Sequence, residues 1–195
     1  LYHRRQRQMC IRDSLRRKMQ AKHHLNASNI VSLNGNVTTR LKKLEDGMCD
    51  CIILAEAGLR RLDLINKELN FIRLQHYTNF AQGTLAVQWK TESEHVREMW
   101  SGAMREMKEK YNLDMSTYDI NRTKEIKTGH EVLKELNADC NSAIALEVKC
   151  DESSTDIVGE IYGRNRYIYF YANKVSDAIK TIKEKGGLEL LNEHN

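Results

Sequence analysis

The sequence predicts an α/β protein that continues into a small α+β domain, and two observations carry this prediction. Cys51–Leu54 is an unbroken apolar run between two helical patterns, which is typical of a parallel strand covered on both faces. The C-terminal third instead alternates apolar and polar residues in short runs separated by turn signals, which predicts antiparallel strands. We therefore expect an α/β unit followed by a three-stranded antiparallel sheet with helices on one face.

The first predicted elements form the α/β unit. A surface helix over 14–24 is followed by a short strand over 29–33. Asn34-Gly35-Asn36 is a turn signal, and Asn36 is the expected N-cap of the next helix because its side chain can accept a backbone hydrogen bond. That helix has apolar residues at spacings of four and three, and it is expected to end at Asp46-Gly47. Residues 55–62 return to helix after the buried strand.

The middle of the chain is expected to hold one strand and one long helix. Residues 81–90 are predicted to form the strand, and 92–110 the helix. The helix has a Met-rich face, which is typical of core or of a packing seam. Residues 111–117 are expected to be a linker.

The C-terminal region is expected to begin with a helix over 121–137 and to end with a second, amphipathic helix over 175–185, stopped by Gly186-Gly187. The predicted strands between these helices cover 143–149, 157–162 and 166–171. Tyr162–Arg166 is a hairpin signal between the last two strands.

Composition limits the classes of function. The net charge is +4 over 195 residues, with basic and acidic residues interleaved, so a nucleic-acid partner is not demanded and a small polyanion fits equally well. No apolar run approaches membrane-spanning length. Five cysteines without a paired framework indicate a reducing compartment. Cys49 and Cys51 form a C-x-C without a second pair or a nearby histidine, so no metal is expected.

The first 13 residues are set apart from the rest. They have no apolar run typical of a secretory signal, and residues 9–13 resemble a translated sequencing adapter. Native sequence is therefore expected to begin near Ser14. The alternative is a genuine basic arm that binds RNA or targets the chain. A nucleic-acid function would rest on residues 3–24, where no aromatic platform accompanies the charges.

One long motif carries a family resemblance. Gly35–Leu62, GNVTTRLKKLEDGxxDxIILAxAGLRRL, resembles the second domain of the hydroxymethylbilane synthase (porphobilinogen deaminase) family, and Ser14–Arg17 extends the resemblance upstream. The resemblance implies a periplasmic-binding-protein-like α/β domain over 14–82. It also implies a strand, helix and linker over 83–118 that return to the family's first domain, and a cofactor-carrying domain over 119–195.

The resemblance also implies the residues that hold cofactor and substrate. The positions that match cofactor contacts are Ser14, Arg16, Arg17 and Arg40, and those that match contacts to the growing chain are Arg40, Gly58 and Arg61. Each pyrrole ring carries an acetate and a propionate, so a polypyrrole is a polyanion that guanidinium groups and helix N-termini bind. Asn34 stands where the family usually has arginine, which removes one expected contact. From composition alone, Arg16 and Arg17 would instead form a solvated basic face.

Cys140 stands where the family attaches its dipyrromethane cofactor. The thiolate of such a residue attacks the methylene of an azafulvene, and the resulting thioether anchors the growing chain. Leu136–Asn141 lacks the glycines and the proline of the family's L-x-G-G-C-x-P loop, and Gln88 replaces a usual glutamate elsewhere. Without the resemblance, Cys140 would be read as a buried or incidental thiol.

The function implied is that of a transferase that condenses four porphobilinogen units into linear hydroxymethylbilane, with release of ammonia, in tetrapyrrole and heme biosynthesis. The chain would then be an N-terminally truncated part of a longer parent, and inactive alone because the family's catalytic aspartate belongs to the first domain. The parent is expected to be a monomer in the cytoplasm or a plastid, without nucleic-acid or membrane partners. The alternative is a non-catalytic module of the same fold that binds polypyrroles or other polycarboxylates.

Overall fold

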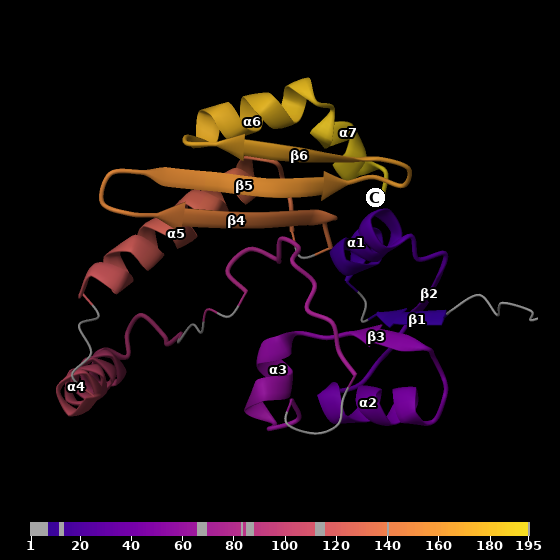
Figure 1. Cartoon of the computed structure of the whole chain (residues 1–195). Coiled ribbons are helices and arrows are strands. Elements are labelled where there is room, and N and C mark those ends of the chain that lie inside the picture. The colour runs from indigo at the N-terminus through magenta and orange to yellow at the C-terminus, as the bar shows by residue number, and fades with distance from the viewer. Residues whose placement is uncertain are drawn as a thin grey trace, which may run out of the picture.

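The N-terminal half contains a three-stranded parallel sheet (Figure 1). The computed structural model describes residues 8–11, 14–65, 70–82, 84, 88–111, 116–139 and 141–194. The central strand β1 (Gln8–Ile11) pairs in parallel with β2 (Asn29–Ser32) on one side and with β3 (Cys51–Ile53) on the other. The predicted strands at 29–33 and 51–54 are therefore confirmed, and the second of them is parallel as expected.

The central strand comes from the segment that was set apart in the sequence. The adapter origin of the first 13 residues stays a prediction. In the structure, the backbone of residues 8–11 separates β2 from β3, and among the described strands β1 is the one that joins them.

Each strand of this sheet leads into a helix. The helices are α1 (Leu15–Leu25), α2 (Val37–Glu45) and α3 (Glu56–Arg61). Figure 1 shows α1 on one face of the sheet, and α2 and α3 on the other. Asn36 caps α2 as predicted, because its Oδ1 accepts the Thr39 backbone N–H at 2.8 Å. Gly47, at φ 72°, follows the end of α2 in the left-handed conformation that glycine adopts readily.

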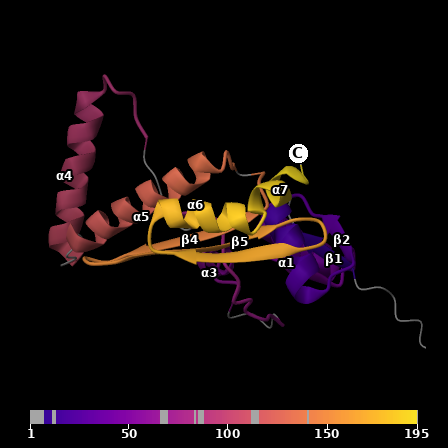
Figure 2. The same cartoon turned by 90° about the horizontal axis from the view of Figure 1, so that it is seen from above.

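The middle of the chain departs from the sequence predictions in three ways. Residues 83 and 85–87 of the predicted strand lie outside the described residues, and its described residues form no strand. The helix α5 (Ser116–Glu135) begins earlier than predicted, so residues 116–117 are helical rather than linker. α4 (Glu94–Tyr111) extends away from both sheets (Figure 2), and the expected packing of its Met-rich face is not found among the described residues. Met99 on that face is 67% exposed.

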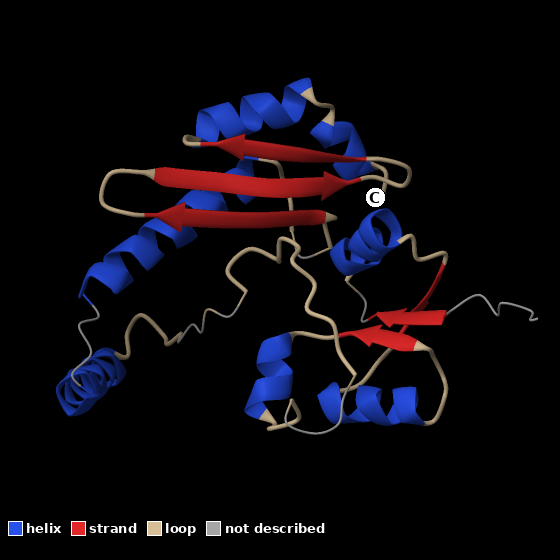
Figure 3. Cartoon of the chain, in the orientation of Figure 1, coloured by secondary structure: helices blue, strands red, loops and turns tan. Residues whose placement is uncertain are grey.

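The C-terminal half is an antiparallel sheet of order β4-β5-β6, as predicted (Figure 3). Its strands are β4 (Ile144–Cys150), β5 (Thr155–Tyr162) and β6 (Tyr167–Ala172). Alternate residues of all three strands face α5, α6 (Val175–Glu184) and the unpredicted short helix α7 (Gly187–Asn192). The large, fully buried side chains of this core include Val132, Leu146, Ile157, Ile161, Phe170, Ile182 and Leu190. The predicted arrangement of helices on one face is therefore confirmed.

The opposite face of this sheet meets the N-terminal half. Met19 of α1 packs against Ala143, Ala145 and the fully buried ring of Tyr162. The segment 70–82 runs between the two halves (Figure 1), and its Thr78 carbonyl accepts the Leu146 backbone N–H at 3.1 Å. Helix α1 and this segment thus join the two sheets.

Candidate anion-binding site

The carboxyl edge of the parallel sheet collects the starts of α1, α2 and α3. Because β1, β2 and β3 are parallel and each leads directly into its helix, these N-termini lie at the same edge. Ligands of open α/β sheets bind at this edge, where helix N–H groups favour anions. The Ser14 side chain caps α1 by accepting the Arg17 backbone N–H at 3.4 Å. Ser14 thereby fixes the first turn that carries Arg16 and Arg17.

Arg16 is buried at this edge among neutral groups. Its side chain is 7% exposed, and its Nη1 donates to Gln20 Oε1 at 2.5 Å and to the Tyr77 carbonyl at 3.3 Å. Burial, and then the neighbouring Arg17, lower the pKa of Arg16 to about 10. The guanidinium is therefore charged at neutral pH. Within the described part of the chain, no carboxylate is bonded to it, and its buried Nε has no hydrogen-bond partner.

An anion is the group that this environment lacks. A buried charge is stable when it is paired, and a buried N–H without an acceptor is costly. A carboxylate placed against Arg16 would supply both the counter-charge and an acceptor for Nε. The arrangement therefore fits a carboxylate-bearing ligand.

The other predicted arginines occupy different settings. Arg40 lies near the start of α2 and is 8% exposed, and Arg17 is half-buried in the first turn of α1. The topology brings both of them to the same sheet edge as Arg16. Arg61 is exposed and is the last residue of α3, so the structure does not bring it to that edge. Gly58 lets α3 approach α2, because a Cβ there would lie 3.2 Å from Val37 Cγ2.

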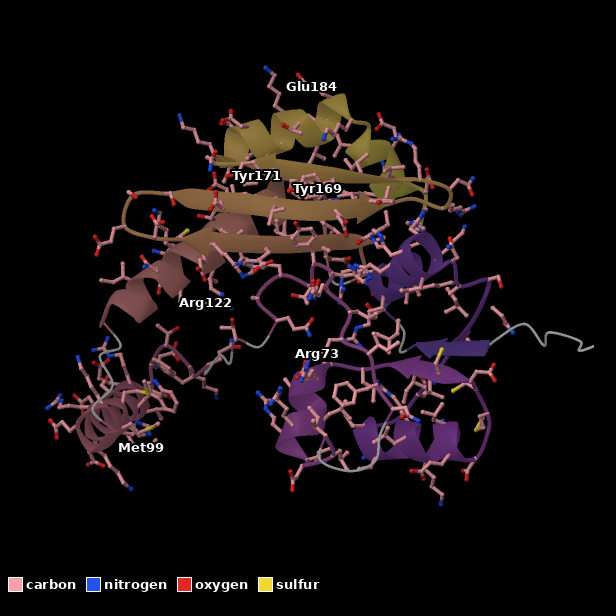
Figure 4. All side chains as sticks on the ribbon, in the orientation of Figure 1. Arg73, Met99, Arg122, Tyr169, Tyr171 and Glu184 are labelled. Carbon is pink, nitrogen blue, oxygen red and sulfur yellow. The ribbon has the colours of Figure 1, made fainter. Side chains whose placement is uncertain are left out.

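Nearby surface arginines are paired with acids. Arg73, labelled in Figure 4, binds Glu56 at 3.1 Å and lies 5.5 Å over the Phe71 ring. Arg60 binds the same carboxylate at 2.6 Å. These hydrogen bonds, with Arg73 first, lower the pKa of Glu56. Arg60 and Arg73 therefore have a carboxylate partner within the chain, whereas Arg16 donates to the neutral carbonyl oxygens of Gln20 and Tyr77.

The predicted cofactor attachment point, Cys140, lies outside the described residues. Its neighbour Asp139 accepts the Asn141 backbone N–H at 2.8 Å, and this bond is the main cause of a lowered pKa of Asp139. A cleft of about 390 Å³ lies beside this loop. Its lining residues are Asn79, Phe80, His130, Leu133, Lys134, Ala138, Asp139, Ile144 and Leu146.

A second polar cluster was missed by the sequence analysis. His24 of α1, His76 of the segment 70–82, and Glu160 and Tyr162 of β5 meet where α1 touches the C-terminal sheet; we call these four residues the histidine joint. The Tyr162 hydroxyl donates to the Glu160 carboxylate, which is 7% exposed, and His24 Nε2 lies 3.4 Å from the same carboxylate. Burial, and then this hydrogen bond, raise the pKa of Tyr162 well above its usual range. The four residues of the histidine joint come from distant parts of the sequence, so no local sequence pattern could have indicated that they meet.

Across the residues that the structure describes, no group of three or more His, Cys, Asp or Glu side chains could hold a metal ion. None of the described helices is both long enough and apolar enough to cross a bilayer.

Comparison with known proteins gives one consistent family. Residues 4–98 match the family model "Porphobilinogen deaminase, dipyromethane cofactor binding domain". The porphobilinogen deaminase of Francisella tularensis subsp. novicida is 50% identical over 62 residues, which are 32% of this chain and 21% of that protein. The "Probable porphobilinogen deaminase" of Methanocaldococcus jannaschii is 43% identical over 65 residues, or 33% of this chain and 22% of that protein. The matched segment spans about a fifth of the length of these relatives, and Cys140 lies beyond it.

Proposed function

We propose that the chain is part of a hydroxymethylbilane synthase, because residues 4–98 match the porphobilinogen deaminase family model and the relatives found are porphobilinogen deaminases. The reaction is the condensation of four porphobilinogen units into linear hydroxymethylbilane. In each step a carbon–carbon bond forms between the aminomethyl carbon of one porphobilinogen and the free α-carbon of the growing chain. The amino group leaves as ammonia, and the attacking α-carbon loses its proton. Water supplies the hydroxymethyl oxygen when the completed four-ring chain is released.

The observation that carries this proposal is the environment of Arg16. This residue is a buried, charged guanidinium with an unpartnered Nε among the described residues, at the edge where α/β sheets bind anions. A polypyrrole presents two carboxylates per ring, so it supplies the counter-charge that Arg16 lacks. A neutral ligand would leave the guanidinium uncompensated.

The dipyrromethane cofactor of the family fits the same edge. Arg16, Arg17 and Arg40 hold its carboxylates in this proposal, with Ser14 fixing the first turn of α1, and Cys140 forms the thioether. When bound, the cofactor supplies the covalent anchor on which the pyrrole chain grows. The family resemblance assigns Gly58 and Arg61 to the path of the growing chain, and Arg61 lies at the end of α3, away from the sheet edge.

The proposal extends to the whole parent protein. Its N-terminal sheet is one unit of a periplasmic-binding-protein-like fold, which the helices on both faces support. The parent works as a cytoplasmic monomer. The isolated chain binds polypyrroles without turnover, because the aspartate that stabilises the cationic intermediates in the resembled family lies in its first domain.

Titration with uroporphyrin tests the proposal, because each of its pyrrole rings carries an acetate and a propionate. We expect saturable quenching of porphyrin fluorescence by the wild-type chain, and binding about tenfold weaker in R16M, through loss of one charge-assisted contact. The matched control is R105M, which removes an exposed arginine on α4 and leaves affinity unchanged. Equal affinities of R16M and wild type would overturn the proposed site. A chain that binds but never carries a pyrrole adduct, even with porphobilinogen and the complete parent sequence, would be the non-catalytic module.

A further inference from the structure

Gln20 lies one helical turn after Arg16 and is itself 7% exposed. Its Oε1 accepts from Arg16 Nη1 at 2.5 Å, and its Nε2 donates to the Tyr77 carbonyl at 2.7 Å. A guanidinium can only donate and a carbonyl can only accept, so these two partners fix which way the Gln20 amide points. Both ends of the amide are therefore engaged, and the side chain has one orientation.

This geometry determines the plane of the Arg16 guanidinium. Nη1 is shared between Gln20 Oε1 and the Tyr77 carbonyl, at 2.5 and 3.3 Å, while the buried Nε has no partner in the described part of the chain. Both acceptors of the guanidinium among the described residues are therefore on Nη1, and the buried Nε is left without one. Carboxylates bind arginine best when two parallel N–H groups are presented together.

We propose that Gln20 is a positioning residue for the anion site: it holds Arg16 so that Nε faces the carboxylate of a bound polypyrrole. This inference rests on the proposed function, and it adds a residue that neither the sequence analysis nor the family resemblance assigned a role. Gln20 does not touch the ligand. It acts through the guanidinium, and it also fixes the guanidinium relative to the segment 70–82.

The same contact connects the anion site to the C-terminal sheet. Tyr77, whose carbonyl receives both Gln20 and Arg16, precedes Thr78, whose carbonyl accepts the Leu146 N–H of β4 at 3.1 Å. Met19, which directly precedes Gln20 on α1, is also buried and packs against the same sheet. A displacement of the Gln20 amide would therefore change where Arg16 stands relative to β4.

A double-mutant cycle with uroporphyrin tests the proposal. The four chains are wild type, Q20M, R16M and R16M/Q20M, because methionine keeps the length of glutamine and removes both hydrogen bonds. Q75M is the matched control, since Gln75 is exposed in the segment 70–82. We expect Q20M to bind uroporphyrin about tenfold more weakly than wild type. We expect R16M/Q20M to bind with the same affinity as R16M. Q75M keeps the wild-type affinity.

Each outcome decides between the possibilities. A loss of affinity that is the same in the presence and absence of Arg16 would make Gln20 merely structural, and wild-type affinity in Q20M would overturn its role altogether.

If the wild-type chain binds no uroporphyrin, the proposed function fails first. In that case the nitrogen-15 NMR signal of Arg16 Nε–H still tests the positioning, because Q20M should shift and broaden it while Q75M should not. Should Q20M fail to fold, Q20E keeps an acceptor for Arg16. Its carboxylate competes with the ligand, so binding must still weaken.

Discussion

The imidazole of His24 stacks on the imidazole of His76, with ring centroids 4.6 Å apart and ring planes inclined by 19°. One ring comes from α1 and the other from the segment 70–82, and the Glu160 carboxylate of β5 lies 3.4 Å from His24 Nε2. His24 also contacts the rings of Tyr162 and Tyr167 on the sheet, and His23 of α1 contacts the same two tyrosines. Three elements therefore meet through groups whose charge depends on pH.

Acidification should weaken the histidine joint. Burial, and then His24, lower the pKa of His76 below its usual 6.5, while Glu160 opposes the shift. The unfolded chain then takes up the proton more readily than the folded one, so this contribution to stability is complete above pH 6.5 and is lost as the pH falls below it. Urea unfolding between about pH 8 and pH 5 should show a smaller loss of stability in H76Q than in wild type. H95Q, which changes an exposed histidine of α4, should keep the wild-type dependence of stability on pH. If H76Q loses as much stability between these pH values as the wild type, the prediction is contradicted.

Removing the Tyr162 hydroxyl should destabilise the fold. The ring is fully buried and its hydroxyl donates to the buried Glu160 carboxylate, so Y162F leaves a buried charge with one donor fewer. We expect the free energy of unfolding to fall by about 1–3 kcal/mol. The control is Y167F on the neighbouring strand, where the ring is 41% exposed and the same substitution should cost less than about 0.5 kcal/mol. Equal losses in the free energy of unfolding in Y162F and Y167F would refute a special role for the hydrogen bond between Tyr162 and Glu160.

Alanine should have opposite effects at two helical glycines. A Cβ at Gly129 of α5 would lie 1.9 Å from the Phe80 ring, so G129A must displace Phe80 from its packing on the helix. We expect a loss of about 1–3 kcal/mol by chemical denaturation. A Cβ at Gly102 of α4 meets nothing within 4 Å, so G102A should gain about 0.5–1 kcal/mol from helix propensity. Stabilisation by G129A would show that Phe80 does not occupy this position.

The attachment of the cofactor is predicted at Cys140. When the complete parent protein is produced with porphobilinogen, intact mass should show a dipyrromethane adduct that peptide mapping places on Cys140. C140S should abolish the adduct, and C51S, which removes a half-buried thiol of β3, should retain it. An adduct that persists in C140S would place the attachment elsewhere.

Restoring an arginine at Asn34 should strengthen anion binding. Asn34 is exposed just after β2, and its backbone carbonyl accepts from Lys43 at 3.1 Å, a contact that does not need the asparagine side chain. N34R should bind uroporphyrin about threefold more tightly at low salt, as an exposed ion pair allows. Salt should reduce this gain. N70R, at another exposed asparagine, should leave affinity unchanged; if both variants bind equally well, net charge alone is responsible.

Local signals predicted most of the secondary structure. The Asn36 cap lies three residues from the N–H that it accepts, and the alternation along β4, β5 and β6 is visible in consecutive residues. The extra turn of α5 and the short helix α7 were missed because their sequences carry weak start signals. Contacts between distant residues were also missed: Gln20 and Tyr77 are 57 residues apart, and His24 and Tyr162 are 138 apart.

The candidate site was predicted in part. The resemblance selected Arg16, but the sequence could not show that this guanidinium is buried between Gln20 and the Tyr77 carbonyl, because that environment forms only when α1 meets the segment 70–82. Arg61 shows the converse: it matches a family position, yet a short helix places it away from the sheet edge. The assigned roles of these residues and of Cys140 stay predictions.

The position of β1 has a consequence for how the N-terminal sheet assembles. Since β2 and β3 both pair with this strand and with no other described strand, a chain shortened to begin at Ser14 would present a vacant slot with hydrogen-bonding edges on both sides. Any extended tetrapeptide of suitable hydrophobicity could occupy that slot in parallel register, as in donor-strand complementation. The slot would thus select a strand by its backbone pairing and its hydrophobicity rather than by one particular sequence.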